Sequence, residues 1–449
     1  MKKYAFYLSA TVVLALAFVS CGSGGNNGGG SQTISITGVS LNKTEMALKV
    51  DAQETLAATV RPSDATNKTL TWTSSNTNVA AVSNSGVVTA ISAGEATITV
   101  TTQDGGKTAG CFLTVLPPGP DVYVAGFEWQ FRSEAAPLWK NGMRQNLNSG
   151  YWGEAKSVFV SGEDVYVAGY DSNAVRTVAM LWKNGEAQPP LSNGNFTGCA
   201  NSVFVSDGDV YVAGYERNEL GRFVAKLWKN GIVSQTLNNG NYNAWATSVF
   251  VSGGDVYVAG YENDYATLFE PDEAVASVVA KLWKNGILYQ TFNNGNYNAF
   301  ANSVYVSGND VYVAGYEHNE RGTSAMLWKN GVGQELSVEN YAQAYSVFVS
   351  GDDVYVAGYE IDSQTAKRSA MLWKNGVGQA LNEVTDPAIP RYRAEARSVF
   401  VSGDDVYVTG YQQSGMFGER DAATLWKNGV AQRLDESHPF TGGHSVFVK

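Results

Sequence analysis

The chain has 449 residues, of which 44% are apolar and 16% are charged, and its formal net charge is −11. This composition excludes a largely disordered chain. The negative charge argues against binding to the phosphates of DNA or RNA, so no nucleic-acid partner is expected. With 48 Gly, 24 Tyr and 11 Trp residues, the composition indicates an all-β protein with many turns.

The N-terminus has the pattern of a secretory signal. Two Lys residues follow Met1, and residues 5–19 form a mostly apolar run that is too short to span a membrane comfortably. Val19 and Ser20 stand directly before Cys21, which resembles a bacterial lipobox, although Phe18 stands where that family usually has Leu. The resemblance implies a signal peptide at residues 1–20 and a lipid on Cys21. An ordinary signal peptide with an incidental Cys is the alternative.

Residues 21–32 form a Gly-rich tether, which is expected to be flexible. Residue 22 is Gly rather than Asp, so the inner-membrane retention signal of many lipoproteins is absent. We therefore expect an outer-membrane lipoprotein of a Gram-negative bacterium, which faces either the periplasm or the cell surface.

Residues 33–116 alternate apolar and polar side chains in short runs that are separated by Gly, Asn, Asp and Ser. This pattern predicts a small β-sandwich. The stretch also resembles the bacterial Ig-like group 2 family, in which such domains often serve as stalks or adhesive modules. The resemblance rests on Trp72, Gly86-Val87-Val88-Thr89-Ala90 and Gly94-Glu95-Ala96-Thr97-Ile98-Thr99-Val100. We interpret Trp72 as a core residue. A Pro-rich linker follows at residues 117–120.

Residues 121–449 contain an internal repeat. Three short segments each occur seven times in a fixed order. Asp-Val-Tyr-Val begins at Asp121, Asp164, Asp209, Asp255, Asp310, Asp353 and Asp405. Leu-Trp-Lys-Asn-Gly begins at Leu138, Leu181, Leu227, Leu282, Leu327, Leu372 and Leu425. Ser-Val-Phe/Tyr-Val begins at Ser157, Ser202, Ser248, Ser303, Ser346, Ser398 and Ser445.

The turns between these segments predict the topology. A short Gly-bearing loop joins the Ser-Val-Phe-Val strand to the Asp-Val-Tyr-Val strand, and Asn-Gly, which favours a type I′ turn, follows the Trp-Lys pair. Each repeat is therefore predicted to form four antiparallel strands, as in a β-propeller blade. The first repeat lacks its first strand, which appears instead at Ser445–Val448. We predict an Ig-like β-sandwich followed by a seven-bladed β-propeller that the C-terminal strand closes. The repeat resembles the SBBP and HAF repeats of extracellular proteins, neither of which implies a defined activity.

The repeated side chains are interpreted first as structural. The seven Trp residues are expected to pack between blades, and each Lys after a Trp is expected to pair with the Asp that begins the second strand. An acid follows the aromatic residue of the second strand in six of seven copies, from Glu128 to Glu360, with Gln412 in the seventh. These acids are interpreted as bonded to the local backbone or as solvated charges rather than as a cation site. Cys111 and Cys199 fall in different domains, so no disulfide is expected.

The sequence shows no catalytic constellation, no His or Cys spacing typical of a metal site and no cofactor-binding loop. We expect a lipid-anchored binding or adhesion protein whose propeller presents loops to a glycan or a protein. An envelope hydrolase or lyase that acts on polysaccharide and a structural scaffold remain alternatives. The expected binding face carries the long connections between strands, because variable loops on a rigid scaffold usually hold binding residues. The candidate ligand-binding residues are aromatic: Trp152, Phe196, Tyr242, Trp245, Tyr297, Phe300 and Tyr341.

Overall fold

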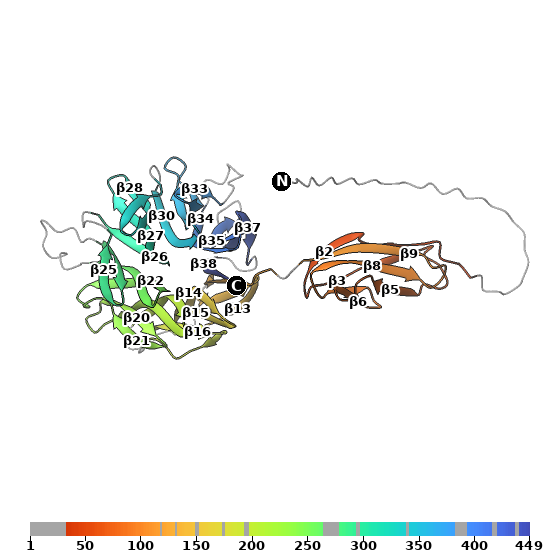
Figure 1. The fold of residues 1–449 in the computed structure, drawn as a ribbon, viewed down its shortest axis with the longest axis horizontal. Coiled ribbons are helices and arrows are strands. Elements are labelled where there is room, and N and C mark those ends of the chain that lie inside the picture. Colours follow the sequence, from red (N-terminus) through yellow and green to blue (C-terminus); the bar gives the residue numbers. More distant parts are fainter. Residues whose placement is uncertain are drawn as a thin grey trace, which may run out of the picture. The chain divides into compact units, whose positions relative to one another are not determined.

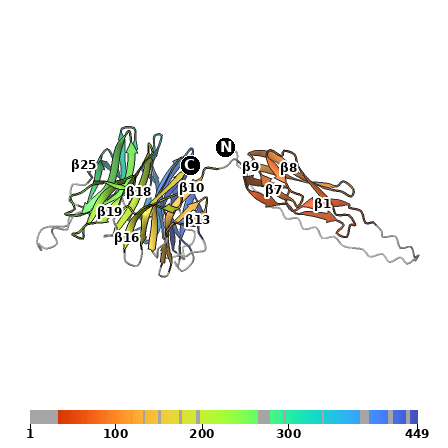
Figure 2. The same cartoon turned by 90° about the horizontal axis from the view of Figure 1, so that it is seen from below.

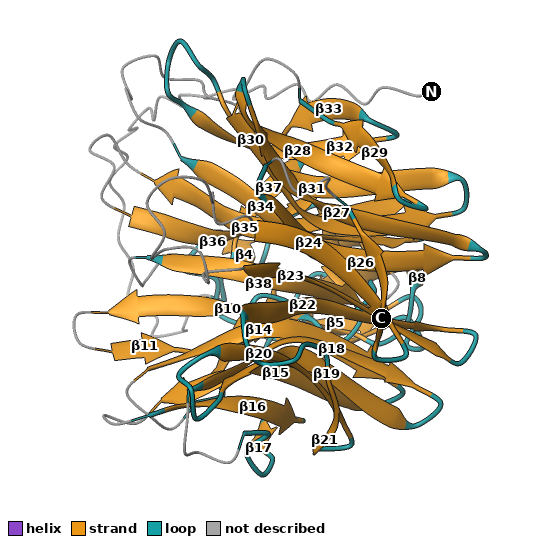
Figure 3. Cartoon of the chain, turned by 90° about the vertical axis from the view of Figure 1, so that its left-hand side faces the viewer, coloured by secondary structure: helices purple, strands orange, loops and turns teal. Residues whose placement is uncertain are grey.

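The structure is a computed structural model. It describes residues 33–116, 119–130, 133–148, 152–172, 176–192, 197–263, 278–292, 297–337, 341–381, 393–414, 420–435 and 440–449. Cys21 and Phe196 lie outside these residues. The chain divides into two compact units, residues 1–119 and 120–449. Within the described part, every regular element is a strand (Figure 3), and no helix that could cross a membrane is present there.

The first unit is a small β-sandwich. Its larger sheet has the strand order β2-β9-β8-β5, a three-stranded sheet has the order β3-β7-β6, and β1 pairs with β4. The strands are β1 (Gly38–Leu41), β2 (Glu45–Lys49), β3 (Gln53–Thr55), β4 (Ala58–Arg61), β5 (Leu70–Ser74), β6 (Ala80–Val82), β7 (Val87–Ala90), β8 (Gly94–Thr102) and β9 (Thr108–Leu116). The alternate residues of β8 are buried, as expected for a strand with one face on a core.

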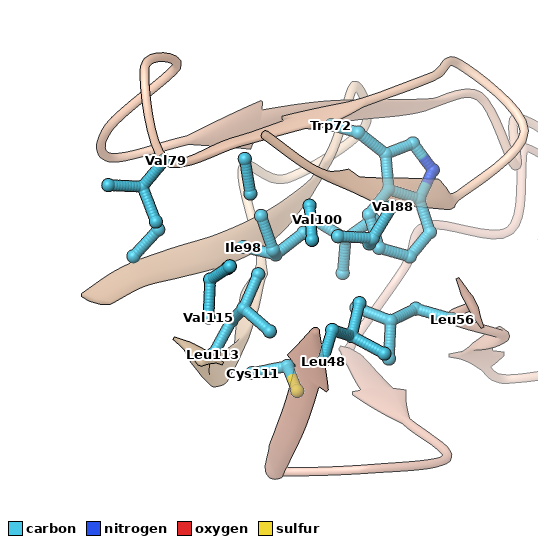
Figure 4. Packing of buried hydrophobic residues seen from close by; sticks show 13 residues of the cluster. Leu48, Leu56, Trp72, Val79, Val88, Ile98, Val100, Cys111, Leu113 and Val115 are labelled. Atoms are coloured by element: carbon cyan, nitrogen blue, oxygen red, sulfur yellow. The ribbon is translucent and has the colours of Figure 1, made fainter. Parts of the chain in front are cut away.

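Trp72 lies in the core of this unit, as predicted. Its side chain is among the cluster that contains Ile98, Val100 and Leu113, all of which are buried (Figure 4). Gly86 lies beside the indole, because a Cβ at Gly86 would come within 3.0 Å of the ring and 2.4 Å of the Leu56 carbonyl oxygen. Gly86 also has a φ of 82°, which L side chains rarely adopt. Cys111 is buried and forms no disulfide.

The described residues of the second unit form seven antiparallel sheets of four or five strands. In Figure 1 the chain colour runs around this unit from yellow to blue, and Figure 2 shows the sheets edge-on. We number the strands of each sheet first to fourth from its inner edge, where the first strands of neighbouring sheets contact one another. These are the sheets of a β-propeller.

The first strands are β14 (Trp152–Ser161), β18 (Gly198–Ser206), β22 (Asn243–Ser252), β26 (Ala299–Ser307), β30 (Tyr341–Ser350), β34 (Ala394–Ser402) and β38 (Thr441–Val448). The second strands are β15 (Asp164–Ser172), β19 (Asp209–Arg217), β23 (Asp255–Asn263), β27 (Asp310–Asn319), β31 (Asp353–Ile361), β35 (Asp405–Ser414) and β10 (Val122–Gln130).

The third strands are β16 (Thr177–Lys183), β20 (Phe223–Lys229), β24 (Val278–Lys284), β28 (Gly322–Lys329), β32 (Arg368–Lys374), β36 (Arg420–Lys427) and β12 (Pro137–Lys140). The fourth strands are β17 (Glu186–Ala187), β21 (Ile232–Thr236), β25 (Ile287–Thr291), β29 (Val332–Glu335), β33 (Val377–Ala380), β37 (Val430–Arg433) and β13 (Met143–Asn146). A short extra strand, β11 (Ser133–Ala135), also pairs with β10.

Six of the seven sheets have two tight turns, whereas the sheet of β38 and β10 has the Asn-Gly turn alone. The two turns of a sheet lie at the same end, because neighbouring strands are antiparallel. We call this the tight-turn end, and we call the opposite end, where the longer connections lie, the long-loop end. At the tight-turn end, Asn184 and Gly185 have φ values of 52° and 82°, as expected for the Asn-Gly type I′ turn. The equivalent Asn has a φ between 50° and 52° in the other six sheets.

The predicted Lys–Asp pair is present in all seven sheets. In one of them, Lys183 contacts Asp164 at 2.8 Å, and the Asn184 amide also donates to Asp164 at 2.8 Å. The hydrogen bonds from Lys183 and Asn184 lower the pKa of Asp164. These groups are exposed to solvent, so they define the turn rather than supply much of the stability.

The seven repeated Trp side chains are at most 2% exposed, which confirms that they are core residues. In five of the seven sheets the indole lies within 3.1 Å of the Cβ position of the Gly of the second strand. At Gly169, a Cβ would lie 2.0 Å from the Glu154 carbonyl oxygen and 3.1 Å from the Trp182 ring. Only Gly allows the first strand and the indole to approach this closely.

The first strands are also linked to one another. Seven aromatic side chains stand in a row with ring centroids 4.6–5.0 Å apart, and both ends of that row meet at Phe447, which contacts Phe159 and Phe400. The repeated Ser accepts a hydrogen bond from the next first strand, for example from Val203 N to Ser157 Oγ at 3.1 Å. The C-terminal strand β38 pairs antiparallel with β10.

Candidate functional site

Each first strand carries a β-bulge one residue before its repeated Ser. The bulged residue has no partner in the strand ladder, so its identity is not constrained by pairing. We call this the bulge position. Its residues are Lys156, Asn201, Thr247, Asn302, Tyr345, Arg397 and His444.

A second variable position lies two residues earlier, closer to the long-loop end, and we call it the rim position. Its residues are Glu154, Cys199, Trp245, Phe300, Gln343, Glu395 and Gly442. Each rim residue pairs across the sheet with an aromatic residue of the second strand: Tyr170, Tyr215, Tyr261, Tyr316, Tyr359, Tyr411 or Phe127. The two positions break the symmetry of the repeat at the inner edge of the sheets.

At three bulge positions, the side chain links one sheet to the next. Asn201 donates to the carbonyl of Ala246 at 2.8 Å, and Thr247 and Asn302 make equivalent bonds at 2.8 Å. A hydrogen bond of this kind contributes roughly 0.5–1.5 kcal/mol to stability. These three residues therefore have a structural role.

The remaining bulge residues, in β30, β34, β38 and β14, belong to a different arrangement. Around them lie two carboxylates, three cations and a His, which we call the charged cluster. Its members are Glu154, Lys156, Arg368, Glu395, Arg397 and His444. They come from three neighbouring first strands and the third strand β32.

His444 lies at the centre of the charged cluster and joins its two halves. Its Nδ1 is 3.0 Å from an Nη1 of Arg397, and its Nε2 is 3.1 Å from Oε2 of Glu154. A guanidinium can only donate, so Nδ1 accepts and the ring proton must be on Nε2, which donates to Glu154. Burial, together with the charge of Lys156, lowers the pKa of His444 to about 3, although Glu154 opposes this shift. His444 is therefore neutral at neutral pH.

The carboxylates of Glu154 and Glu395 are buried, and each pairs with at least one cation. Burial alone would raise the pKa of Glu154, but the His444 hydrogen bond and the charge of Lys156 outweigh it and leave the pKa well below its usual range. Glu395 accepts from Nε and Nη2 of Arg397 at 3.3 and 3.1 Å, and it also pairs with Arg368. The side chains of Glu154 and Glu395 are 11% and 4% exposed, whereas those of the three cations are 27–28% exposed.

Aromatic rings support the guanidinium groups. The Cζ of Arg368 lies 4.5 Å from the centre of the Tyr359 ring, and that of Arg397 lies 5.4 Å from the Tyr411 ring. Phe127 and Tyr345 also lie within 5.9 Å of Arg397. Such cation–π contacts hold the guanidinium planes in place without using their N–H donors.

On the first strands β22 and β26, the rim positions are aromatic. Trp245 and Phe300 contact Tyr261 on either side, with centroids 5.0 and 4.9 Å apart, and Phe300 stacks on Tyr316 at 4.5 Å. We call these four residues the aromatic sector. Trp245 and Phe300 are partly exposed, so their rings present apolar faces beside tyrosine rings.

The structure brings together Trp245 and Phe300, two of the seven aromatic residues selected from the sequence. The others that are described stand apart: Trp152 and Tyr341 begin their strands and are 45% and 40% exposed, and Tyr297 donates to Glu320 at 3.2 Å. The carbonyl of Tyr242 accepts from Asn238 at 3.0 Å. Phe196 lies outside the described residues.

One aspect of the loop prediction was wrong. Trp152, Trp245, Phe300 and Tyr341 were expected in loops, but they lie in the strands β14, β22, β26 and β30. The cause is the bulge, because pairing between first and second strands resumes beyond it, as at Trp245↔Tyr261. These side chains are consequently held on a sheet, and their directions are set by it.

Sequence reasoning did not select the charged cluster. A signal was present, because the residue before the repeated Ser differs in nearly every copy whereas its surroundings recur.

The acids of the second strands were expected to bond to the local backbone or to be solvated. Two of them form ion pairs instead: Glu128 pairs with Arg144 and Glu262 pairs with Lys281. Among the described residues, no group of three His, Cys, Asp or Glu side chains is arranged to hold a metal ion.

The fold and this site define a β-propeller with an asymmetric inner edge, and an Ig-like domain precedes it in the chain. Residues 35–112 match the bacterial Ig-like domain (group 2) family. An uncharacterized protein of Clostridium acetobutylicum is 44% identical over 80 residues, which is 18% of this chain and 8% of that protein. An alpha-L-arabinofuranosidase of Bifidobacterium longum subsp. longum is 48% identical over 84 residues, 19% of this chain and 8% of the relative.

The chain thus spans 8% of the length of both of these relatives. Among solved structures, it is similar to the β-propeller domain of the Trilobed protease from Pyrococcus furiosus, with a TM-score of 0.39 and 10% identity. That match covers 79% of this chain and 98% of the other.

Proposed function

We propose that this chain is a lipid-anchored binding protein of the bacterial cell envelope, whose propeller binds a glycan or a protein at its long-loop end. One observation carries the proposal. Fourteen inner-edge positions, the bulge and rim positions of seven sheets, vary within a repeat that otherwise recurs. They include a charged part with partly exposed cations and an aromatic part with partly exposed rings. A purely structural role of the inner edge would not require one charged part and one aromatic part.

Exposed aromatic residues at the same end support binding. Trp152 and Tyr341 begin first strands, and Trp129 lies near the end of a second strand at 53% exposure. Aromatic side chains supply large contact areas at a low entropic cost. A scaffold without a ligand would gain nothing from leaving them in water.

A polysaccharide hydrolase or lyase is the second candidate, and the two carboxylates Glu154 and Glu395 favour it, because they break the symmetry of the repeat. Their surroundings argue against it. A general acid needs a raised pKa, whereas His444 and Lys156 lower that of Glu154. Both carboxylates are also buried and engaged by cations.

We further propose that the seven sheets are the blades of one closed ring, with β38 as the closing strand. Phe447 of β38 lies between Phe159 and Phe400 at 4.9 and 4.8 Å. Ser445 accepts from Val158 N at 3.2 Å, as its counterparts do elsewhere. These contacts support closure, since β38 stands in the row of first strands like any other member.

The proposed location in the cell envelope and the lipid anchor rest on the sequence. Residues 1–20 would be removed as a signal peptide, Cys21 would carry the lipid, and the Gly-rich tether would connect it to the Ig-like domain. The Ig-like domain would then serve as a stalk. Metabolic labelling with a radioactive or clickable fatty acid tests this, with Cys21→Ala as the unlabelled control.

The binding function is tested with the full-length chain on a glycan array and in pull-downs from envelope extracts. A variant with Trp245→Ala and Phe300→Ala should lose the ligand. A matched variant with Ile232→Ala and Ile287→Ala removes two side chains that are each 74% exposed on fourth strands at the tight-turn end, and it should bind normally. A ligand that is lost only in the matched variant would refute the proposal.

A further inference from the structure

We infer that the charged cluster is a binding site for the anionic groups of an acidic glycan, and that the aromatic sector holds neighbouring sugar rings. The inference rests on the proposed function and names the chemical class of its ligand. The overall net charge of −11 would repel an anionic ligand. The inference therefore depends on the local distribution of charge in the charged cluster.

The first step concerns which charges reach solvent. At neutral pH the cluster holds the three cations Lys156, Arg368 and Arg397, and the two carboxylates Glu154 and Glu395. His444 is neutral, because its pKa is lowered to about 3. Counting these groups gives a net charge of three minus two, or +1. The carboxylates are almost completely buried whereas the cations are more than a quarter exposed, so an approaching ligand meets positive charge.

The second step concerns hydrogen-bond donors. Arg368 engages Glu395 through Nη1 and also bonds to Tyr411, and a guanidinium has five N–H donors in a planar fork. Lys156 engages Glu154 and lies 3.5 Å from Nε2 of His444, and an ammonium has three donors. The two carboxylates therefore hold the cations in position, and further N–H groups are left to bind carboxylate or sulfate oxygens, which guanidinium groups recognise with two parallel bonds.

The third step concerns the hydrogen bonds between sheets that the bulge residues make. In β18, β22 and β26 the bulge residue bonds to the next sheet. In β34, β38 and β14 the same position holds Arg397, His444 and Lys156, which engage the charged cluster instead. The bulge residues that engage the charged cluster lie on three adjacent first strands, and those that bond to the next sheet lie on three others. This grouping of charged side chains on adjacent strands is the pattern of a site, because a purely structural role would be spread over the sheets.

The fourth step concerns the ligand as a whole. The aromatic sector occupies rim positions of β22 and β26, and the charged cluster occupies those of β34 and β14. Both lie at the same level of the first strands, with one first strand on each side between them. Aromatic faces suit the apolar faces of sugar rings, and fixed cations suit acidic substituents. An acidic polysaccharide satisfies both, whereas a small anion would use only the cations.

The thiol of Cys199, which lies next to the charged cluster, is not expected to react. Cys199 occupies the rim position between Glu154 and Trp245. Burial raises its pKa to about 12, so the group is a neutral thiol rather than a reactive thiolate. It fills space between the charged cluster and the aromatic sector.

The experiment measures binding of the full-length chain to three polymers by isothermal titration calorimetry: polygalacturonate, dextran sulfate and neutral dextran. Binding is expected with one or both acidic polymers, which separates carboxylate from sulfate recognition, and not with dextran. Arg368→Gln and Lys156→Gln should each weaken binding about tenfold or more, as loss of a hydrogen bond from a charged group does.

Lys329→Gln is the matched control. Lys329 is likewise paired with an acid, Asp310, but it is half exposed and lies at the tight-turn end. The variant therefore changes the net charge equally and should bind as the wild type does. Melting temperatures of all variants confirm that they are folded. The inference is overturned if neither acidic polymer binds, or if Lys329→Gln weakens binding as much as Arg368→Gln.

One outcome separates this inference from the proposed function. If neutral dextran binds as well as the acidic polymers, and binding requires Trp245 but not Arg368, the anionic ligand is wrong and the glycan-binding function stands. If an acidic polymer binds and neither Trp245→Ala nor Arg368→Gln weakens it, both proposals fail.

Discussion

Closure of the ring by β38 leads to a quantitative comparison of two Phe residues. Phe447 lies between Phe159 and Phe400 with centroids 4.9 and 4.8 Å away, and Phe204 lies between Phe159 and Phe250 with both at 4.8 Å. Both are half buried. The two side chains thus have nearly identical surroundings, although one is near the C-terminus and the other is in the middle of the chain.

The expected cost of Phe→Ala follows from these contacts. A fully buried Phe costs about 3–5 kcal/mol when truncated, and half burial reduces this to roughly 2 kcal/mol. Two aromatic pairs add about 0.5–1.5 kcal/mol each. We therefore expect Phe447→Ala and Phe204→Ala to lower the free energy of unfolding equally, by about 3–5 kcal/mol.

The assay is guanidinium chloride unfolding of the full-length chain, followed by tryptophan fluorescence. The seven repeated Trp residues are at most 2% exposed in the propeller, so this signal follows the propeller transition. If β38 closes the ring, the two variants shift the midpoint by similar amounts. A cost below about 1 kcal/mol for Phe447→Ala, beside a normal cost for Phe204→Ala, would refute closure, since a frayed terminal strand contributes little.

Three further predictions concern stability. Deletion of residues 443–449 should lower the melting temperature sharply, because it removes the buried Val446 and Val448 and exposes the edge of β10; an unchanged melting temperature would contradict closure. Residues 33–116 expressed alone should unfold cooperatively, as measured by circular dichroism, because their core is complete within the first unit; an unfolded fragment would show that it depends on the rest of the chain. The pKa of His444 is about 3 in the folded protein, below its ordinary value of 6.5. Its neutral form therefore stabilises the fold above pH 6.5, and that stability is lost as pH falls from 6.5 toward 3. Lowering the pH from 7 to 5 should destabilise the wild type by about 2 kcal/mol more than His444→Gln, and equal losses would mean that His444 is protonated in the folded protein.

Much of the fold followed from local rules. Asn-Gly at seven fixed places specifies a type I′ turn, because both residues tolerate positive φ, and the structure has it in every sheet. The burial of the seven Trp residues followed from their recurrence at one position, since a repeated large apolar side chain is best explained by repeated packing. The paired Lys and Asp followed from strand direction alone.

The charged cluster could not be predicted in the same way. Its members are up to 290 residues apart in the chain, as for His444 and Glu154, and they meet only because β38 and β14 are neighbours. The bulge itself could not be deduced, because variation at the position of Lys156 does not show that the residue is unpaired. Strand pairing beyond the bulge was missed for the same reason, and Trp245 was assigned to a loop.

The bulge has an evolutionary consequence. A residue outside the hydrogen-bond ladder can be exchanged for almost any other without disturbing the pairing on either side, as Lys156, Asn201 and Tyr345 illustrate at equivalent places. A chain that arose by duplication of one unit would begin with seven identical inner positions. Single substitutions at those positions would then diversify recognition one blade at a time, while every turn, every Trp and every strand stayed as it was.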